Sequence, residues 1–340
     1  MKSLFLSTTI CLFFIPLTQA QEIEEAGYIE ISTDRIKNTN IKSIKEESDC
    51  YVEQEKPPYK FEDCGEKTKE EYDKNGHLTS LKLYEDGDLT DTYTYLYEEN
   101  KLVSEKEDDG EDTTKKTYRY NTSGLLIEKK EYDNNTLEYL YTYAYNKKGF
   151  MIEKEYTSLR EDSGAFGGTT YSKTIYTYNN NGKCTSETEY HKDGREKNKI
   201  IYEHSNTNGH TILEKEKHDE DKYVPQYSIT YDTRGNITEK ILYSYYGKQE
   251  ERRVRTFDAN NNVLTYESYN EDNVLVNHIV YNYNAQKDPI QEVSTRNKDD
   301  QYIRKYMYEY DERGNWITRV TLKDGDEYIS NEVKRTIKYY

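Results

Sequence analysis

Short stretches of alternating residues recur along the chain and predict β-strands. Tyrosine takes every second position in TYTYLY ending at Tyr97 and KYMYEY ending at Tyr310, and near the end of LEYLYTYAY at Tyr145. A period of two, carried by Tyr and Thr, indicates strands rather than helices. Most of these stretches are followed by Asp or Asn, two variable residues and Gly. That order predicts a type I turn followed by a residue at positive φ, a common hairpin connection.

Strand and turn together form a repeat of about 26 residues. The repeat has ten anchor positions, each just before the turn: Tyr72, Tyr97, Tyr120, Tyr145, Tyr178, Ser205, Tyr231, Phe257, Tyr283 and Tyr310. The glycine position holds Gly76, Gly124, Gly149, Gly182, Gly209, Gly235 and Gly314. Asn261 replaces glycine after Phe257, and Asn readily adopts a left-handed conformation. Lys287 breaks the rule after Tyr283, and the copy at Tyr97 is one residue short. We therefore expect those two turns to differ in form.

An apolar position lies two residues after the glycine position. It is filled by Leu78, Leu126, Met151, Cys184, Ile237, Val263 and Trp316. Cys184 is therefore interpreted as a small buried hydrophobe. Trp316, the single tryptophan, is interpreted as core rather than as a ligand platform.

The second turn of each repeat is acidic and contains glycine, as in EDGD at residues 85–88. Two strands of about eight residues per repeat give about twenty antiparallel strands. Open sheets beyond about ten strands tend to curl or split. We therefore predict an all-β fold of about ten β-hairpin repeats, forming one long antiparallel meander sheet that coils into a spiral or partial shell.

The repeat domain covers residues 72–340, after an N-terminal cap segment at 21–71 that is expected to cover the first exposed edge. One long interval contains EDSGAFGGTT at 161–170, which is either a mobile functional loop or a tolerated insertion without function.

Residues 1–20 predict a secretory signal peptide. Lys2 precedes an apolar run that ends at Leu17, and Thr18-Gln19-Ala20 predicts cleavage before Gln21. The run is shorter than the roughly 20 residues that span a bilayer. The mature chain is therefore expected to be secreted or periplasmic. In an exported chain Cys50 and Cys64 predict a disulfide, with two unpaired thiols as the alternative.

Composition excludes several classes of partner. Leu, Ile, Val and Phe make up less than a fifth of the chain, which with a net charge of −17 is typical of disorder. The 38 tyrosines reverse that reading, because each ring can bury apolar area while its hydroxyl stays wet. The negative charge argues against nucleic acid and against anionic lipid surfaces.

The motif YDxxGN followed by an apolar residue, plainest at residues 231–237 and 310–316, resembles the YD-repeat or rearrangement-hotspot family of bacterial secreted proteins. The resemblance covers residues 72–340. It implies β-hairpin repeats that wind into a spiral or cocoon, and a carbohydrate-binding or shell function. The toxin core signature of the large members is lacking here, so a toxin or self-cleaving chemistry is not expected.

No catalytic motif, cofactor fingerprint or metal-ligand spacing is found, and the chain is expected not to be an enzyme. Acidic turns as Ca²⁺ sites and the group His204, His210 and His218 as a metal site are weak alternatives. We expect a secreted protein that binds glycan or protein at the cell envelope, without membrane insertion. The alternatives are a protective shell beside a larger partner and an outer-membrane β-barrel. Charges on both strand faces weigh against the barrel, because lipid-facing Lys or Arg costs about 2 to 4 kcal/mol at the midplane.

Overall fold

The computed structural model describes residues 40–52, 60–160, 171–205, 210–219, 222–296, 300–323 and 328–340. Side chains at 49–52, 60–66, 210–211, 216–219, 222 and 328–329 lie outside the description. The described residues form 22 strands: β1 Ile41–Val52, β2 Lys60–Tyr72, β3 Leu78–Glu85, β4 Asp88–Glu98, β5 Lys101–Asp108, β6 Thr113–Tyr120, β7 Leu126–Asp133, β8 Thr136–Tyr145, β9 Met151–Ser158, β10 Tyr171–Tyr178, β11 Cys184–Tyr190, β12 Glu196–Ser205, β13 His210–Asp219, β14 Lys222–Tyr231, β15 Ile237–Tyr243, β16 Gln249–Phe257, β17 Val263–Tyr269, β18 Leu275–Tyr283, β19 Pro289–Arg296, β20 Asp300–Tyr310, β21 Trp316–Lys323 and β22 Tyr328–Tyr339. No helix in these ranges is long and apolar enough to cross a bilayer.

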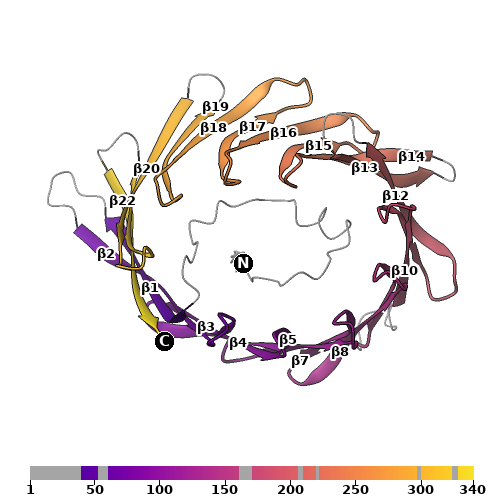
Figure 1. The fold of residues 1–340 in the computed structure, drawn as a ribbon, viewed down its shortest axis with the longest axis horizontal. Coiled ribbons are helices and arrows are strands. Elements are labelled where there is room, and N and C mark those ends of the chain that lie inside the picture. The colour runs from indigo at the N-terminus through magenta and orange to yellow at the C-terminus, as the bar shows by residue number, and fades with distance from the viewer. Residues whose placement is uncertain are drawn as a thin grey trace. The chain divides into compact units, whose positions relative to one another are not determined.

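The 22 strands belong to one sheet, and its first strand pairs with its last (Figure 1). Strand β1 is antiparallel to β2 on one side and to β22 on the other. Its Ile44 faces Glu70 of β2 and Ile337 of β22, and Glu46 lies opposite Arg335. Because the terminal strands are bonded to each other, the sheet closes as a β-barrel and leaves no free edge between them.

Closure corrects the predicted architecture. The all-β class and the succession of antiparallel hairpins are confirmed, but the spiral or partial shell is wrong. Residues 41–52 and 60–71, which the sequence placed in a cap, lie in strands of the same sheet. Strand β1 was expected to cover an exposed edge of the sheet. Instead it pairs with both β2 and the last strand, β22.

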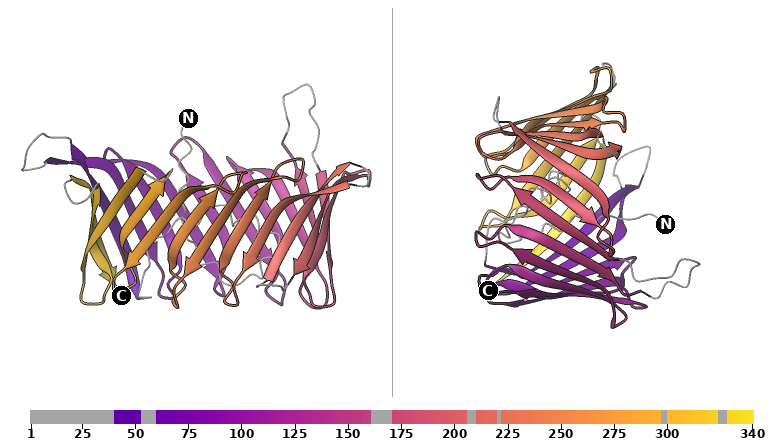
Figure 2. Two further views of the ribbon diagram at one scale, coloured as in Figure 1. Left: turned by 90° about the horizontal axis from the view of Figure 1, so that it is seen from above. Right: turned by 90° about the vertical axis from the view of Figure 1, so that its right-hand side faces the viewer.

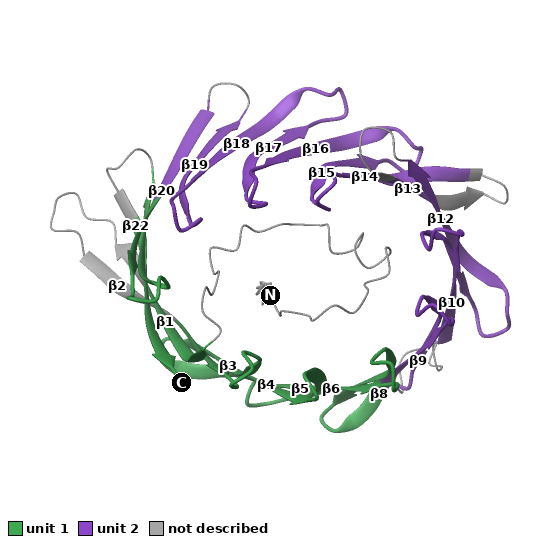
Figure 3. Ribbon diagram, viewed as in Figure 1, with its two compact units in different colours: residues 1–16, 28–138, 306–340 green, residues 17–27, 139–305 purple. Residues whose placement is uncertain are grey.

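The chain divides into two compact units, each of which is described by itself (Figure 3). Unit 1 contains 28–138 and 306–340, and therefore both strands of the closing pair; unit 2 contains 139–305. Within each unit, neighbouring strands run side by side and reverse direction at every turn (Figure 2).

The predicted turn recurs after most even-numbered strands. In the first copy the N–H of Gly76 donates to the carbonyl of Asp73 (3.1 Å), and Asp73 Oδ1 accepts the N–H groups of Asn75 and His77. Gly76 has φ +86°, as the type I turn followed by a left-handed residue requires. The residue after the anchor thus sets the turn, and glycine completes it.

The two exceptional copies behave differently from each other. After Tyr97 the connection is the pair Glu99 and Asn100, both at positive φ, so that turn differs in form as predicted. After Tyr283 the prediction is wrong, because Lys287 adopts φ +69° and donates to the carbonyl of Asn284 as glycine does elsewhere. The surrounding hairpin therefore imposes the turn on a residue that does not favour it.

A β-bulge accompanies most of the anchored turns. The anchor pairs directly with the apolar residue that begins the next strand, as Tyr72 does with Leu78 and Tyr178 with Cys184, and the register shifts by one residue beside that pair. The bulge places anchor and apolar residue on one face of the sheet. We call this the tyrosine face, and the other side the opposite face.

Candidate functional site

Three anchor hydroxyls on the tyrosine face link their repeat to the one before it. Tyr120 donates to the carbonyl of Leu102 (2.9 Å), Tyr178 to that of Met151 (2.5 Å) and Tyr283 to that of Val263 (2.8 Å). Rings also stack on the preceding turn, as Tyr178 does on Phe150, with centroids 5.1 Å apart. These tyrosines therefore have a structural role, because they hold neighbouring repeats of the sheet together.

The tyrosine face of unit 1 is polar as well as aromatic. Tyr93 and Tyr95 on β4 lie opposite Glu107 and Glu105 on β5. The Tyr93 hydroxyl donates to Glu107 (2.8 Å), and Lys116 Nζ is 2.8 Å from Glu105. Carboxylates, cations and phenols therefore alternate on one surface.

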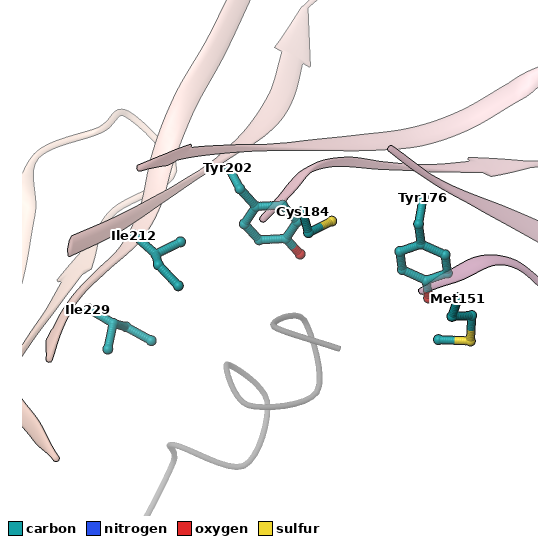
Figure 4. Packing of buried hydrophobic residues seen from close by; sticks show 6 residues of the cluster. All are labelled: Met151, Tyr176, Cys184, Tyr202, Ile212 and Ile229. Atoms are coloured by element: carbon teal, nitrogen blue, oxygen red, sulfur yellow. The ribbon is translucent and has the colours of Figure 1, made fainter. Parts of the chain in front are cut away.

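The tyrosine face of unit 2 contains the hydrophobic cluster. Its buried members point to the same side of the sheet (Figure 4): Met151, Tyr176, Cys184, Tyr202, Ile212 and Ile229. Cys184 is 1% exposed, which confirms its interpretation as a buried hydrophobe. Its burial explains why the thiol offers no surface nucleophile.

Trp316 in unit 1 is also 1% exposed, so its prediction as core is confirmed. The Arg335 guanidinium carbon lies 3.5 Å from the centroid of its ring. Arg335 Nε donates to Glu46 Oε2 at 2.8 Å, across the β1–β22 pair. We call Glu46, Trp316 and Arg335 the closing cluster, because it joins the first strand to the last.

The opposite face combines an apolar belt with ion pairs. Ile152, Leu264 and Ile290 each follow the first residue of an odd-numbered strand and are about two-fifths exposed. The same face carries the pairs Arg119–Glu128 (3.3 Å), Lys173–Glu153 (2.8 Å) and Arg252–Glu239 (2.7 Å). The belt lies at the end of the strands that carries the anchored turns.

In the turns, hydrogen bonds shift acid groups. The side-chain hydrogen bond from Asn236 lowers the pKa of Asp232 to about 2, against a smaller effect of desolvation. The N–H groups of Asn236 and Arg234 lower it further. Asp232 therefore stays ionised to low pH, and its carboxylate accepts the N–H groups of Arg234 and Asn236 that shape the turn.

The other predicted site residues fall as follows. Cys50 and Cys64 belong to β1 and β2, but their side chains lie outside the described residues, as do Gly209, residues 1–20 and the insertion at 161–170. His204 Nε2 contacts the carbonyl of Cys184, and among the described residues no three His, Cys, Asp or Glu side chains gather as a metal site would need. What sequence reasoning missed is the closing cluster, because the partners Glu46 and Arg335 lie at opposite ends of the chain.

The structure resembles two solved porin-like proteins weakly. One, from Bacteroides uniformis, shares 15% identity over 88% of this chain and 97% of that one, with a TM-score of 0.26. The other, from Bacteroides vulgatus, shares 11% identity over 89% and 99%, with a TM-score of 0.23. Scores this low carry no argument, and the fold rests on the strand pairs above. No curated protein matches the chain.

Several expectations are corrected. The YD-repeat resemblance, and the carbohydrate-binding role it implied, are wrong: the sheet closes, and the matching family model is a different one. Two further expectations are wrong: that the chain does not insert into a membrane, and that it binds glycan or protein at the envelope. Both were based on an open repeat sheet, whereas the sheet is closed. The closed barrel supports the β-barrel alternative better than that surface.

A family model described as "Uncharacterised protein" matches residues 29–218, more than half of the 340-residue chain. The chain belongs to that family.

Proposed function

We propose that the chain is a non-enzymatic β-barrel protein of the outer membrane of the cell envelope. The observation that carries this proposal is the antiparallel pairing of β1 with β22 in one sheet. A sheet can cross lipid only if every backbone group is bonded within the protein, and a closed sheet meets that condition. An even number of antiparallel strands between 8 and 26 is usual for such barrels.

The two ends of the strands support the same assignment. At one end, most even-numbered strands finish in the anchored turns, and Tyr340 N–H donates to the carbonyl of Asn40 (3.1 Å). At the other end, connections vary from the short turn after Glu85 to the stretch 159–170. Outer-membrane barrels have short turns on the periplasmic side and longer loops outside. The predicted leader agrees with export to the envelope.

The side chains on the two faces of the sheet agree with membrane insertion in part only. A polar tyrosine face suits the interior of a barrel, and the belt of Ile152, Leu264 and Ile290 suits contact with lipid. The ion pairs on the opposite face oppose it, since a lipid-facing Lys or Arg costs about 2 to 4 kcal/mol at the midplane and about 0 to 1 kcal/mol near the interfaces. Insertion must therefore be measured directly.

The experiment uses the mature chain from residue 21, folded in detergent and mixed with phosphatidylcholine vesicles. We expect it to float with the vesicles and to migrate in a heat-dependent manner in SDS gels. The variant Leu264→Lys should insert less well, while Glu271→Lys, which adds a lysine in the turn after β17, should insert normally. A folded chain that stays in solution without detergent and does not float would refute the proposal.

A further inference from the structure

Two buried cations on the tyrosine face of unit 2 have no carboxylate within hydrogen-bond distance among the described residues. Lys240 is 6% exposed and Arg255 is 7% exposed. Their close contacts are with ring faces: Lys240 Nζ lies 4.9 Å from the centroid of the Tyr227 ring, and Arg255 Cζ lies 5.5 Å from that of Tyr266. A cation–π contact offsets only part of the hydration that a buried cation loses. Among the described residues, neither group is therefore bonded directly to a counter-charge.

A third cation makes the arrangement more unfavourable. Arg253 lies directly opposite Lys240 on the neighbouring strand, and Arg255 is two residues further along the same face. Direct partners have Cβ atoms about 4.5 to 5.5 Å apart and diagonal ones about 7 to 8 Å, and like charges at these positions destabilise a sheet. The sheet thus holds three cations together where their repulsion is strongest.

The acidic groups around them do not remove the excess. Glu251 accepts two hydrogen bonds from Arg253, at 2.7 and 2.6 Å, and so belongs to that pair. Glu214, which also acts on Lys240, lies opposite Tyr227 and is 8% exposed. Among the described side chains with the largest effects on Lys240, two cations, with Lys240 itself a third, face two carboxylates, an excess of one positive charge in a chain of net charge −17.

We infer that Lys240 and Arg255 form a binding site for a small oxyanion, the phosphate or carboxylate group of a solute. Such a group accepts hydrogen bonds from an ammonium and from a guanidinium edge together, and supplies the counter-charge that the sheet lacks. Binding itself does not require a bilayer; its meaning as the solute class of a membrane barrel rests on the function proposed above.

The test is calorimetric titration of the folded mature chain with inorganic phosphate and, separately, with acetate. We expect at least one of the two to bind, and the tighter one identifies the preferred group. Lys240→Met and Arg255→Met should each weaken that binding at least about tenfold, as expected for a lost charge-assisted hydrogen bond. Lys240→Arg, which keeps the charge, should retain most of it.

The matched control is Arg252→Met, which removes a cation from the same strand but on the opposite face. Its binding should stay within about twofold of the original chain. Circular dichroism of each variant shows that the sheet is retained. The inference is overturned if neither anion binds, or if the three methionine variants bind alike. Vesicle flotation is scored separately, so binding without insertion would refute the proposed function and leave this site standing.

Discussion

Both units bury cations against aromatic rings; among the described residues, the buried cation of unit 1 is hydrogen-bonded to a carboxylate and the two of unit 2 are not. Arg335 lies on Trp316 and donates to Glu46 at 2.8 Å. Lys240 and Arg255 in unit 2 lie on Tyr227 and Tyr266 without such a partner. A buried cation with its carboxylate is part of the structure, since it joins β1 to β22. A buried cation without a bonded carboxylate lacks a local counter-charge, and an anionic ligand can supply it. The comparison thus separates a structural role from a binding role among side chains of the same type.

The largest effect is expected from Arg335→Met. The change leaves Glu46 without this cation and removes the nearer of two guanidinium groups over the Trp316 ring, the other being that of Arg319 at 5.2 Å. Removing one partner of a buried pair costs about 3 to 5 kcal/mol, and we expect the lower end because Glu46 is part-buried. Urea unfolding followed by tryptophan fluorescence measures the loss. Lys334→Met is the control: this neighbour is mostly exposed and pairs with Glu332 on the surface, so about 0.5 kcal/mol or less is expected. Equal losses would show that the closing cluster has no special weight.

Lys240→Met should act in the opposite direction. Replacing an uncompensated buried cation with an apolar chain of similar length removes a desolvation penalty and the repulsion from Arg253. We expect the free energy of unfolding in anion-free buffer to rise by about 1 to 2 kcal/mol. A destabilisation like that of Arg335→Met would show that the two cations have the same structural role, and the comparison would fail.

Phosphate, where it is the anion that binds, should stabilise the folded chain through Lys240 and Arg255 and not through Arg335. At a concentration ten times its dissociation constant, a ligand of the folded state raises the free energy of unfolding by about 1.4 kcal/mol. We expect this gain in the original chain and in Arg335→Met, and its absence in Lys240→Met. Thermal unfolding with and without phosphate, at constant ionic strength, makes the measurement. A gain of equal size in all three would indicate a general salt effect.

The sequence predicted these regions unequally because their interactions differ in range. Turn and strand follow from neighbouring residues, so the turn at Gly76 and the burial of Cys184 and Trp316 were predicted from the repeat alone. Closure depends on a pair such as Glu46 and Arg335, and no local pattern connects residues that far apart.

The grouping of the cations Lys240, Arg253 and Arg255 was not predicted either, for a similar reason. Lys240 and Arg253 read as ordinary charges of alternating strands, and only the register of β15 with β16 places them opposite each other. Lys287 shows the converse error: a local rule predicted a different turn, and the hairpin around it imposed the common one.

The smallest effect concerns a feature that both regions share, the anchored turn. Asp232 has a pKa lowered to about 2 from an ordinary value of 3.8. A depressed pKa stabilises the folded chain above the unfolded value, and that contribution is lost as the pH falls through the folded value. We expect stability to decline between about pH 4 and pH 2, and Asp232→Asn to flatten part of this decline.

The turns at Asn121 and Asn146 make the same backbone bonds with an amide side chain, so the variant should still fold. Because Asp311 in unit 1 also has a lowered pKa, acid should weaken turns in both units. A decline unchanged by Asp232→Asn would place the acid-sensitive groups outside this turn. The difference between Arg335 and Lys240 should persist at pH 5, where both turns remain ionised.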